Sequence, residues 1–90
     1  FSKAIGNTKK FAINNNAELI FIYLPDRYEK NEGRFYYKNV IKILNKNNIK
    51  IIDLSKDDFY KKSKNYSKYG GHFNSKGYEQ LALKINDYFN

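Results

Sequence analysis

Cysteine, methionine and tryptophan are missing from this chain of 90 residues, and histidine occurs only once. Without cysteine the chain can form neither a disulfide bond nor a thiolate metal site. A single histidine, His72, also argues against zinc, because a zinc site draws three or four ligands mostly from cysteine and histidine. We therefore expect no metal and no cofactor.

Long apolar runs are missing as well. No run approaches the roughly 18 residues that a membrane span requires, and no signal peptide is recognisable. We expect no transmembrane segment in this chain. Because the chain begins with Phe1 rather than methionine, we expect that the native start lies upstream.

Acidic residues are few beside the basic ones, with 9 Asp and Glu against 17 Lys and Arg and a net charge of +8. Such a balance can indicate nucleic acid or an anionic membrane as a partner. The lysines are spread over most of the chain beside many asparagines, which favours a general Lys/Asn usage bias. We therefore interpret the densest cluster, KKSKNYSK at 61–68, as a solvated surface and expect no nucleic-acid partner.

Hydrophobic residues make up 41% of the chain, which is enough for a folded segment. Three segments, 1–16, 35–48 and 78–89, carry apolar residues at helical spacing, so we predict a helix in each. Asn14 to Asn16 should end the first helix, because asparagine favours turns and helix C-caps.

Two apolar runs, 19–24 and 49–55, predict short strands. The first is unbroken by polar residues, which is typical of a parallel strand buried on both faces. Residues 26–34 predict a polar loop, and 56–71 an irregular polar segment with a helical turn around Phe59 and Tyr60. The order helix, strand, helix, strand, loop, helix indicates an α/β fold with parallel strands and right-handed crossovers.

Two strands cannot form an independent parallel sheet that is covered on both faces. We therefore interpret residues 1–90 as a single segment without an internal domain boundary. We expect this segment to be the C-terminal portion of a larger α/β domain, whose remaining part supplies the missing strands.

Ligands of open α/β sheets bind beyond the carboxyl ends of the strands. Asp26 follows the first predicted strand, Asp57 and Asp58 follow the second, and His72 precedes the last helix. Histidine suits general acid–base catalysis because it titrates near neutral pH. From spacing alone, however, His72 is better interpreted as a residue that merely begins a helix.

The residues around the histidine have physical explanations of their own. Gly70 and Gly71 permit backbone angles that other residues avoid, which would help to aim the imidazole. Asn74 or Ser75 can cap the last helix. Gly77 lies in the first turn of that helix, where a missing side chain permits close packing.

The segment GGHFNSKGYEQLALKI, residues 70–85, resembles the last conserved block of the SGNH (GDSL-type) hydrolase superfamily. Members often end in a histidine, a small or polar turn, a glycine and a helix of the type x-x-L-A-x-x-I. The matching positions are His72, Asn74, Gly77, Leu81, Ala82 and Ile85. LIFIYLPDR, YYKNVIKILNKNNIK and IIDLS also resemble the closing β-α-β unit of the family, so the resemblance covers nearly all 90 residues.

This resemblance implies the C-terminal part of a three-layer α/β/α domain, which is flavodoxin-like with a parallel sheet. It implies hydrolysis or transfer of acyl esters by a serine nucleophile, with His72 as the general base. Backbone amide, glycine and asparagine donors would form the oxyanion hole. It also implies an acyl-ester substrate that can be carbohydrate-linked, and a bacterial envelope or secreted location.

The chain departs from the family in two ways. The nucleophile and oxyanion blocks are not recognisable, and Ser2 lacks the Gly-Asp context, so we expect the isolated chain to be inactive. The aspartate that usually lies two or three residues before the histidine is replaced by Gly70 and Tyr69. The protein would then use a Ser–His pair, be a degenerate member, or use a substitute acid. The candidates for that acid are Asp26, Asp57 and Asp58.

Two alternatives stay open at this point. The first is a non-catalytic SGNH-like binding or accessory module, which the missing aspartate favours. The second is a basic module that binds a polyanion through Lys61, Lys62, Lys64 and Lys68 with Tyr66 and Tyr69.

Overall fold

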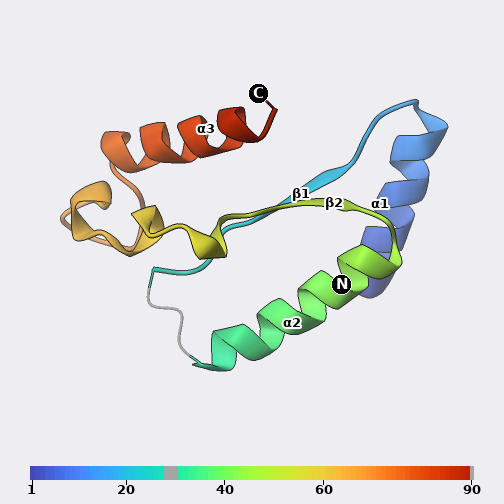
Figure 1. The fold of residues 1–90 in the computed structure, drawn as a ribbon, viewed down its shortest axis with the longest axis horizontal. Coiled ribbons are helices and arrows are strands. Elements are labelled where there is room, and N and C mark those ends of the chain that lie inside the picture. Colours follow the sequence, from blue (N-terminus) through green and yellow to red (C-terminus); the bar gives the residue numbers. More distant parts are fainter. Residues whose placement is uncertain (28–30, 90) are drawn as a thin grey trace. The chain divides into compact units, whose positions relative to one another are not determined.

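A computed structural model describes residues 1–27 and 31–89 of the chain, and only the backbone of 31–35. The elements of this described part follow one another in the order shown in Figure 1. They are α1 (Ser2–Asn14), β1 (Ile20–Tyr23), α2 (Asn31–Lys46), β2 (Lys50–Asp53), the 3₁₀ turns η1 (Leu54–Lys56), η2 (Phe59–Lys61) and η3 (Ser63–Asn65), and α3 (Ser75–Phe89). The predicted α/β character and the predicted order of elements are confirmed.

The three predicted helices all form, but their starts differ from the apolar patterns. α2 begins at Asn31, so the prediction of a loop over 26–34 is wrong at residues 31–34. The part of that prediction at residues 28–30 lies outside the described residues. α3 begins at Ser75, three residues before the first apolar residue of its pattern. Both starts lie in polar sequence, where hydrophobic spacing carries no signal.

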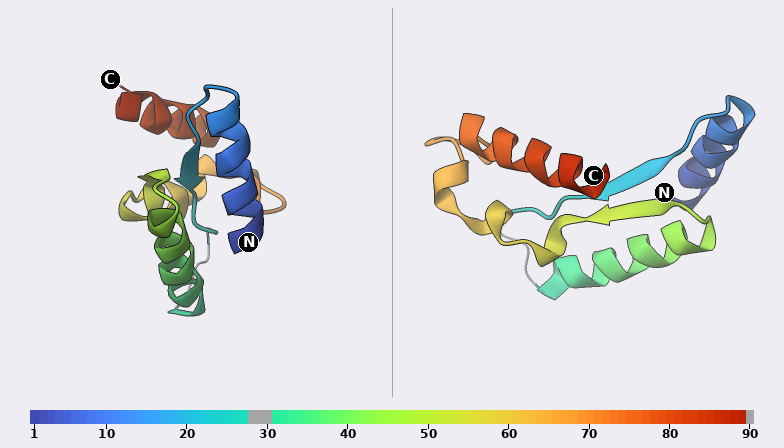
Figure 2. Two further views of the ribbon diagram at one scale, coloured as in Figure 1. Left: turned by 90° about the vertical axis from the view of Figure 1, so that its right-hand side faces the viewer. Right: turned by 45° about the horizontal axis from the view of Figure 1, so that its top comes forward.

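β1 and β2 are neighbours in a two-stranded parallel sheet, which can be followed in Figure 2. The prediction that the first strand is buried on both faces is wrong for this chain. Ile22 is 40% exposed, and the other β1 residues are only half-buried. With two strands in the described part of the chain, each strand has a neighbour on one side only.

The chain forms two compact units, and each has its own core. The first comprises the described residues 1–22 and 31–51. Its buried apolar residues are Ala12, Leu44 and Ile49. Lys9 donates a hydrogen bond to the carbonyl of Asn48 (3.1 Å), and Lys50 forms an exposed ion pair with Glu18 (3.3 Å).

α1 and α2 end in the same way, although the sequence shows no internal repeat. Asn16 and Asn48 adopt left-handed backbone angles, with φ of 55° and 54°. The next N–H group returns to the helix in both cases, from Ala17 to Ala12 (2.8 Å) and from Ile49 to Leu44 (3.0 Å). These are Schellman motifs with asparagine in the position that glycine usually takes. The prediction that Asn14 to Asn16 end the first helix is confirmed.

The second unit comprises the described residues 23–27 and 52–89, and aromatic residues dominate its core. Phe59, Tyr60, Asn65 and Tyr66 are buried, although they lie in the segment 56–71 that the sequence presents as polar and irregular. The helical turn predicted around Phe59 and Tyr60 is confirmed as η2. Side-chain hydrogen bonds fold the segment onto itself, from the Asn65 amide to the Phe59 carbonyl (2.8 Å) and from the Tyr66 hydroxyl to the Tyr60 carbonyl.

Among the described residues, no helix combines the length and the apolar character that crossing a membrane requires.

Candidate active site around His72

His72 lies at the base of a short loop whose two ends are joined. Tyr66 and Phe73 form an antiparallel bridge, and the Ser67 N–H donates to the His72 carbonyl (2.9 Å). The chain reverses within this loop at Gly70, where φ is +80°. That angle is in the left-handed region, so the unusual backbone angle predicted for Gly70 is confirmed. Gly71 has no comparable angle, and its side-chain position faces open space.

Immediately after His72 the chain enters α3 through an asparagine cap. The Asn74 side-chain oxygen accepts a hydrogen bond from the Gly77 N–H (2.9 Å), so of the two predicted caps the structure uses Asn74 rather than Ser75. A Cβ atom on Gly77 would overlap the Asn65 carbonyl oxygen and lie 2.5 Å from the Phe73 ring. The predicted close packing at Gly77 is therefore confirmed.

A cavity of about 400 Å³ opens beside this loop, within the second unit. It brings His72 together with Asp26, which follows β1, although the two residues are far apart in sequence. Its lining is formed by Leu24, Pro25, Asp26, Arg27, Tyr66, Gly71, His72, Phe73, Tyr78 and Leu81. The exposed side chain of His72 can therefore meet a ligand in this cavity.

One wall of the cavity is aromatic and carries a fixed positive charge. The Phe73 ring stacks on Tyr66 at 4.7 Å and meets the edge of Tyr78 at 5.6 Å. The Arg27 guanidinium lies over the Tyr66 ring of this cluster, 4.4 Å from the ring centre. Such a cation–π contact orients the guanidinium and reduces its freedom to move.

The three candidate substitute acids lie in different surroundings. Asp26 lines the cavity with His72. Asp57 accepts hydrogen bonds from Lys84 (2.8 Å) and from the Phe59 N–H (2.9 Å), and these hold the pKa of its carboxyl below the ordinary value. Asp58 is exposed and does not line the cavity. Of the three, the structure brings only Asp26 to the His72 cavity.

Sequence reasoning did not assign the aromatic wall or Arg27 to the site of His72, and it named Tyr66 only as part of a polyanion-binding surface. The stretch Pro25-Asp26-Arg27 at the end of a strand was a usable signal for Arg27. No sequence signal placed Tyr66 and Phe73 beside His72, because their pairing depends on a bridge within an apparently irregular segment.

The lining of the cavity contains one histidine and one carboxylate, but none of the side chains that usually serve as an acyl-transfer nucleophile. Serine, threonine and cysteine are missing from the lining residues that the structure describes. Ser67, the serine of the same loop as His72, instead directs its hydroxyl to the Phe73 carbonyl (3.5 Å). Within the described residues there is also no group of three or more side chains suited to a metal ion.

Comparisons of this chain with protein-family models, curated proteins and solved structures found no significant match.

Proposed function

We propose that this chain is the C-terminal part of an SGNH-type domain that hydrolyses or transfers acyl esters, with His72 as the general base. The supporting observation is the shared cavity, which brings His72 and Asp26 together beyond the carboxyl end of β1. That is the place where open α/β sheets bind their ligands. The finer fold, a three-layer α/β/α domain, is part of the same proposal, because each strand of the described sheet has an edge without a neighbour.

In this proposal a serine from outside the 90 residues supplies the nucleophile. His72 takes the proton of the serine hydroxyl during attack on the acyl carbonyl and returns it to the leaving alcohol. Asp26 takes the role of the aspartate that Tyr69 and Gly70 replace, and stabilises the imidazolium that forms. The oxyanion donors also come from outside this chain.

The residues of the family-like block have physical roles that support the proposal. Gly70 turns the loop and Asn74 caps α3, so the backbone of His72 is held from both sides. Gly77 lets α3 approach the chain at Asn65. A base must keep its position within a few tenths of an ångström to be efficient, and these contacts provide that rigidity.

The test is His72→Ala in the whole gene product, assayed with an activated acetyl ester. General-base catalysis contributes about 10² to 10⁴ in rate, so turnover should fall by that factor. Lys68→Ala is the matched control, because it changes the exposed tip of the same loop and should leave turnover unchanged. Equal turnover of the His72 variant and the wild type would exclude a catalytic role.

One observation favours a second candidate, a non-catalytic binding module of the same fold. The position of the usual aspartate includes Gly70, whose φ of +80° strains most side chains. The backbone conformation of this loop therefore disfavours an aspartate at position 70. Turnover of the acetyl ester separates the two candidates. A binding module has no turnover, so His72→Ala would cause no loss.

A further inference from the structure

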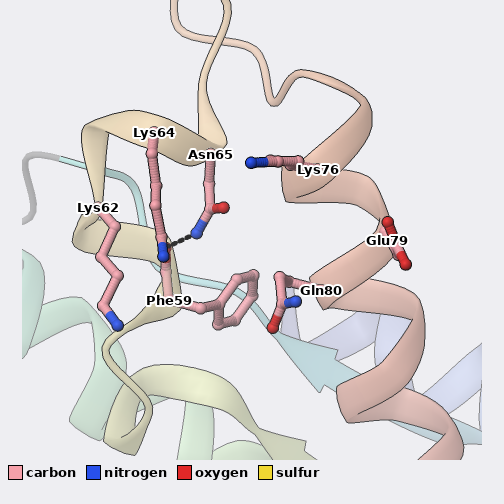
Figure 3. Close-up of a pocket in the computed structure, with 7 residues that line it drawn as sticks. All are labelled: Phe59, Lys62, Lys64, Asn65, Lys76, Glu79 and Gln80. Atoms are coloured by element: carbon pink, nitrogen blue, oxygen red, sulfur yellow. Dashed lines mark hydrogen bonds between the residues drawn. The ribbon is translucent and has the colours of Figure 1, made fainter.

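The second unit contains another cavity, of about 270 Å³, which shares no lining residue with the His72 cavity. η2 and η3 form one side of it and the first turns of α3 form the other (Figure 3). Its lining is formed by Phe59, Lys62, Lys64, Asn65, Lys76, Glu79 and Gln80. The distinctive feature is that three lysines surround one hollow, Lys62 and Lys64 from the η2–η3 segment and Lys76 from α3.

These three lysines have no anionic partner among the residues that the structure describes. Elsewhere in the chain Lys50 and Lys84 do form ion pairs, with Glu18 and Asp57. In Figure 3, Lys76 extends from α3 toward Asn65, while Lys62 and Lys64 extend from the opposite side. Glu79 offsets only part of the repulsion between their ammonium groups, and an anion in the hollow would relieve the rest.

The two sides of this cavity are locked together, which keeps the lysines near one another in the free protein. The Asn74 amide donates to the carbonyls of Lys64 (2.8 Å) and Tyr66 (3.0 Å), and the Asn74 N–H donates to the Asn65 carbonyl (3.0 Å). Asn65 is only 2% exposed, and its side chain is fixed on the Phe59 carbonyl. Because these bonds hold the backbone that carries the lysines, an anion is bound with a smaller entropic cost than by lysines on a flexible segment.

The structure also separates these lysines from the rest of the basic segment 61–68. Lys61 lies over the ring of Tyr60 and Lys68 over the ring of Tyr69, each at 5.6 Å, and neither lines the cavity. Lys76 joins from α3 instead. The basic segment that the sequence presents as a solvated surface therefore contributes to one compact group of lysines. The sequence could not reveal this group, because its third lysine comes from α3.

We propose that this cavity binds the phosphate group of a phosphate monoester. Three lysines and Glu79 give the lining a net charge of +2, which matches the charge of a phosphate monoester near neutral pH better than that of a carboxylate. Lysine ammonium groups are common phosphate ligands, acting as point charges with several donors. The site is separate from the proposed ester chemistry and stands without it.

Calorimetric titration of the whole gene product with inorganic phosphate, at constant ionic strength against chloride, tests the proposal. The test variant carries Lys62→Gln, Lys64→Gln and Lys76→Gln. The control carries Lys56→Gln, Lys61→Gln and Lys68→Gln, which removes the same charge outside the cavity. Each exposed pair contributes about two- to fivefold, so the test variant should bind phosphate at least about tenfold more weakly, and the control should bind like the wild type.

Further arms of the titration identify the source of the phosphate group. Tighter binding of glycerol phosphate than of inorganic phosphate supports a small ester, whereas retention only on phosphatidic-acid vesicles supports a lipid headgroup. The same affinity for acetate as for phosphate would overturn the match to a doubly charged anion. If phosphate binding is weakened equally in the test and control variants, or is weakened in neither of them, the proposed site is overturned.

Discussion

Gly77 faces the backbone carbonyl of Asn65 so closely that a Cβ atom at Gly77 would overlap the carbonyl oxygen. This contact fixes the start of α3 against η3. Because the neighbouring atom belongs to the backbone, a side chain cannot be accommodated by a simple rotamer change. The pair therefore determines how close the helix after His72 can approach the rest of its unit.

Gly77→Ala should lower the free energy of unfolding. Overpacking costs about 1–3 kcal/mol, and the higher helix propensity of alanine offsets up to about 1 kcal/mol of it. We expect a net loss of about 1–2 kcal/mol in urea denaturation. Gly71→Ala is the control, because nothing lies within 4 Å of its side-chain position, and it should stay within about 0.5 kcal/mol of the wild type. A Gly77→Ala variant as stable as Gly71→Ala would refute the close packing.

Asn74 has two separable roles, as the cap of α3 and as an amide donor to the loop. Asn74→Ala removes both and should cost about 1–3 kcal/mol of stability. Asn74→Asp keeps the oxygen that accepts from the Gly77 N–H but loses the donor to the carbonyls of Lys64 and Tyr66. Urea denaturation should rank the aspartate variant between the wild type and the alanine variant. An aspartate variant equal to the wild type would show that the amide bonds contribute nothing.

Asp57 should make stability depend on acid pH. The hydrogen bond from Lys84, followed by that from the Phe59 N–H, lowers the pKa of Asp57 below 3.8 in the folded protein. Its stabilisation is thus fully present above the unfolded pKa and is lost as the pH falls through the folded pKa.

Asp57→Asn should therefore destabilise the protein at pH 7, with a difference that disappears at a pH below the folded pKa of Asp57. Denaturation midpoints at pH 7 and in strong acid measure this difference. Asp58→Asn, which makes the same substitution at the exposed neighbour, serves as the control and should leave stability at pH 7 close to that of the wild type.

The left-handed asparagines give a prediction for the first unit. Asn48 has a φ of 54°, an angle that asparagine tolerates better than alanine does. Asn48→Ala should therefore lower the free energy of unfolding by about 1 kcal/mol. Asn48→Gly should match or exceed the wild type, because glycine adopts this angle without strain. Thermal denaturation of the pair separates the two outcomes, and an alanine variant as stable as the glycine variant would contradict the Schellman assignment. Asn16 should respond in the same way.

Asp26 gives a prediction that depends on the proposed ester chemistry. If Asp26 acts as the substitute acid, Asp26→Asn should lower turnover by up to about 10⁴-fold, the loss caused by removing the orienting aspartate of a triad. Asp57→Asn should lower stability and leave turnover unchanged. Reversed effects on turnover in an acetyl-ester assay would move the acid role from Asp26 to Asp57.

The helices and strands could be predicted because each carries local periodicity or an apolar run. The core of the second unit could not, since Phe59, Tyr60 and Tyr66 lie among lysines and serines without any periodicity. Their burial depends on the Asn65 and Tyr66 hydrogen bonds, which join backbone groups that no sequence pattern reveals.

The candidate site, too, could be predicted only in part. The rule that ligands bind beyond strand ends pointed to Asp26 and His72, which do share a cavity. The same rule could not separate Asp26 from Asp57, because the contact of Asp57 with Lys84 depends on where α3 lies.

The loop that begins at Ser67 and ends at His72 has its two ends tied to each other, while Tyr69 near its tip is 80% exposed. Changes in length at the tip are therefore decoupled from the histidine beneath it. A short peptide tag inserted after Tyr69 should leave the imidazole where it is. The loop is thus a natural point for attaching a label, and for variation in length and sequence above one unchanged histidine.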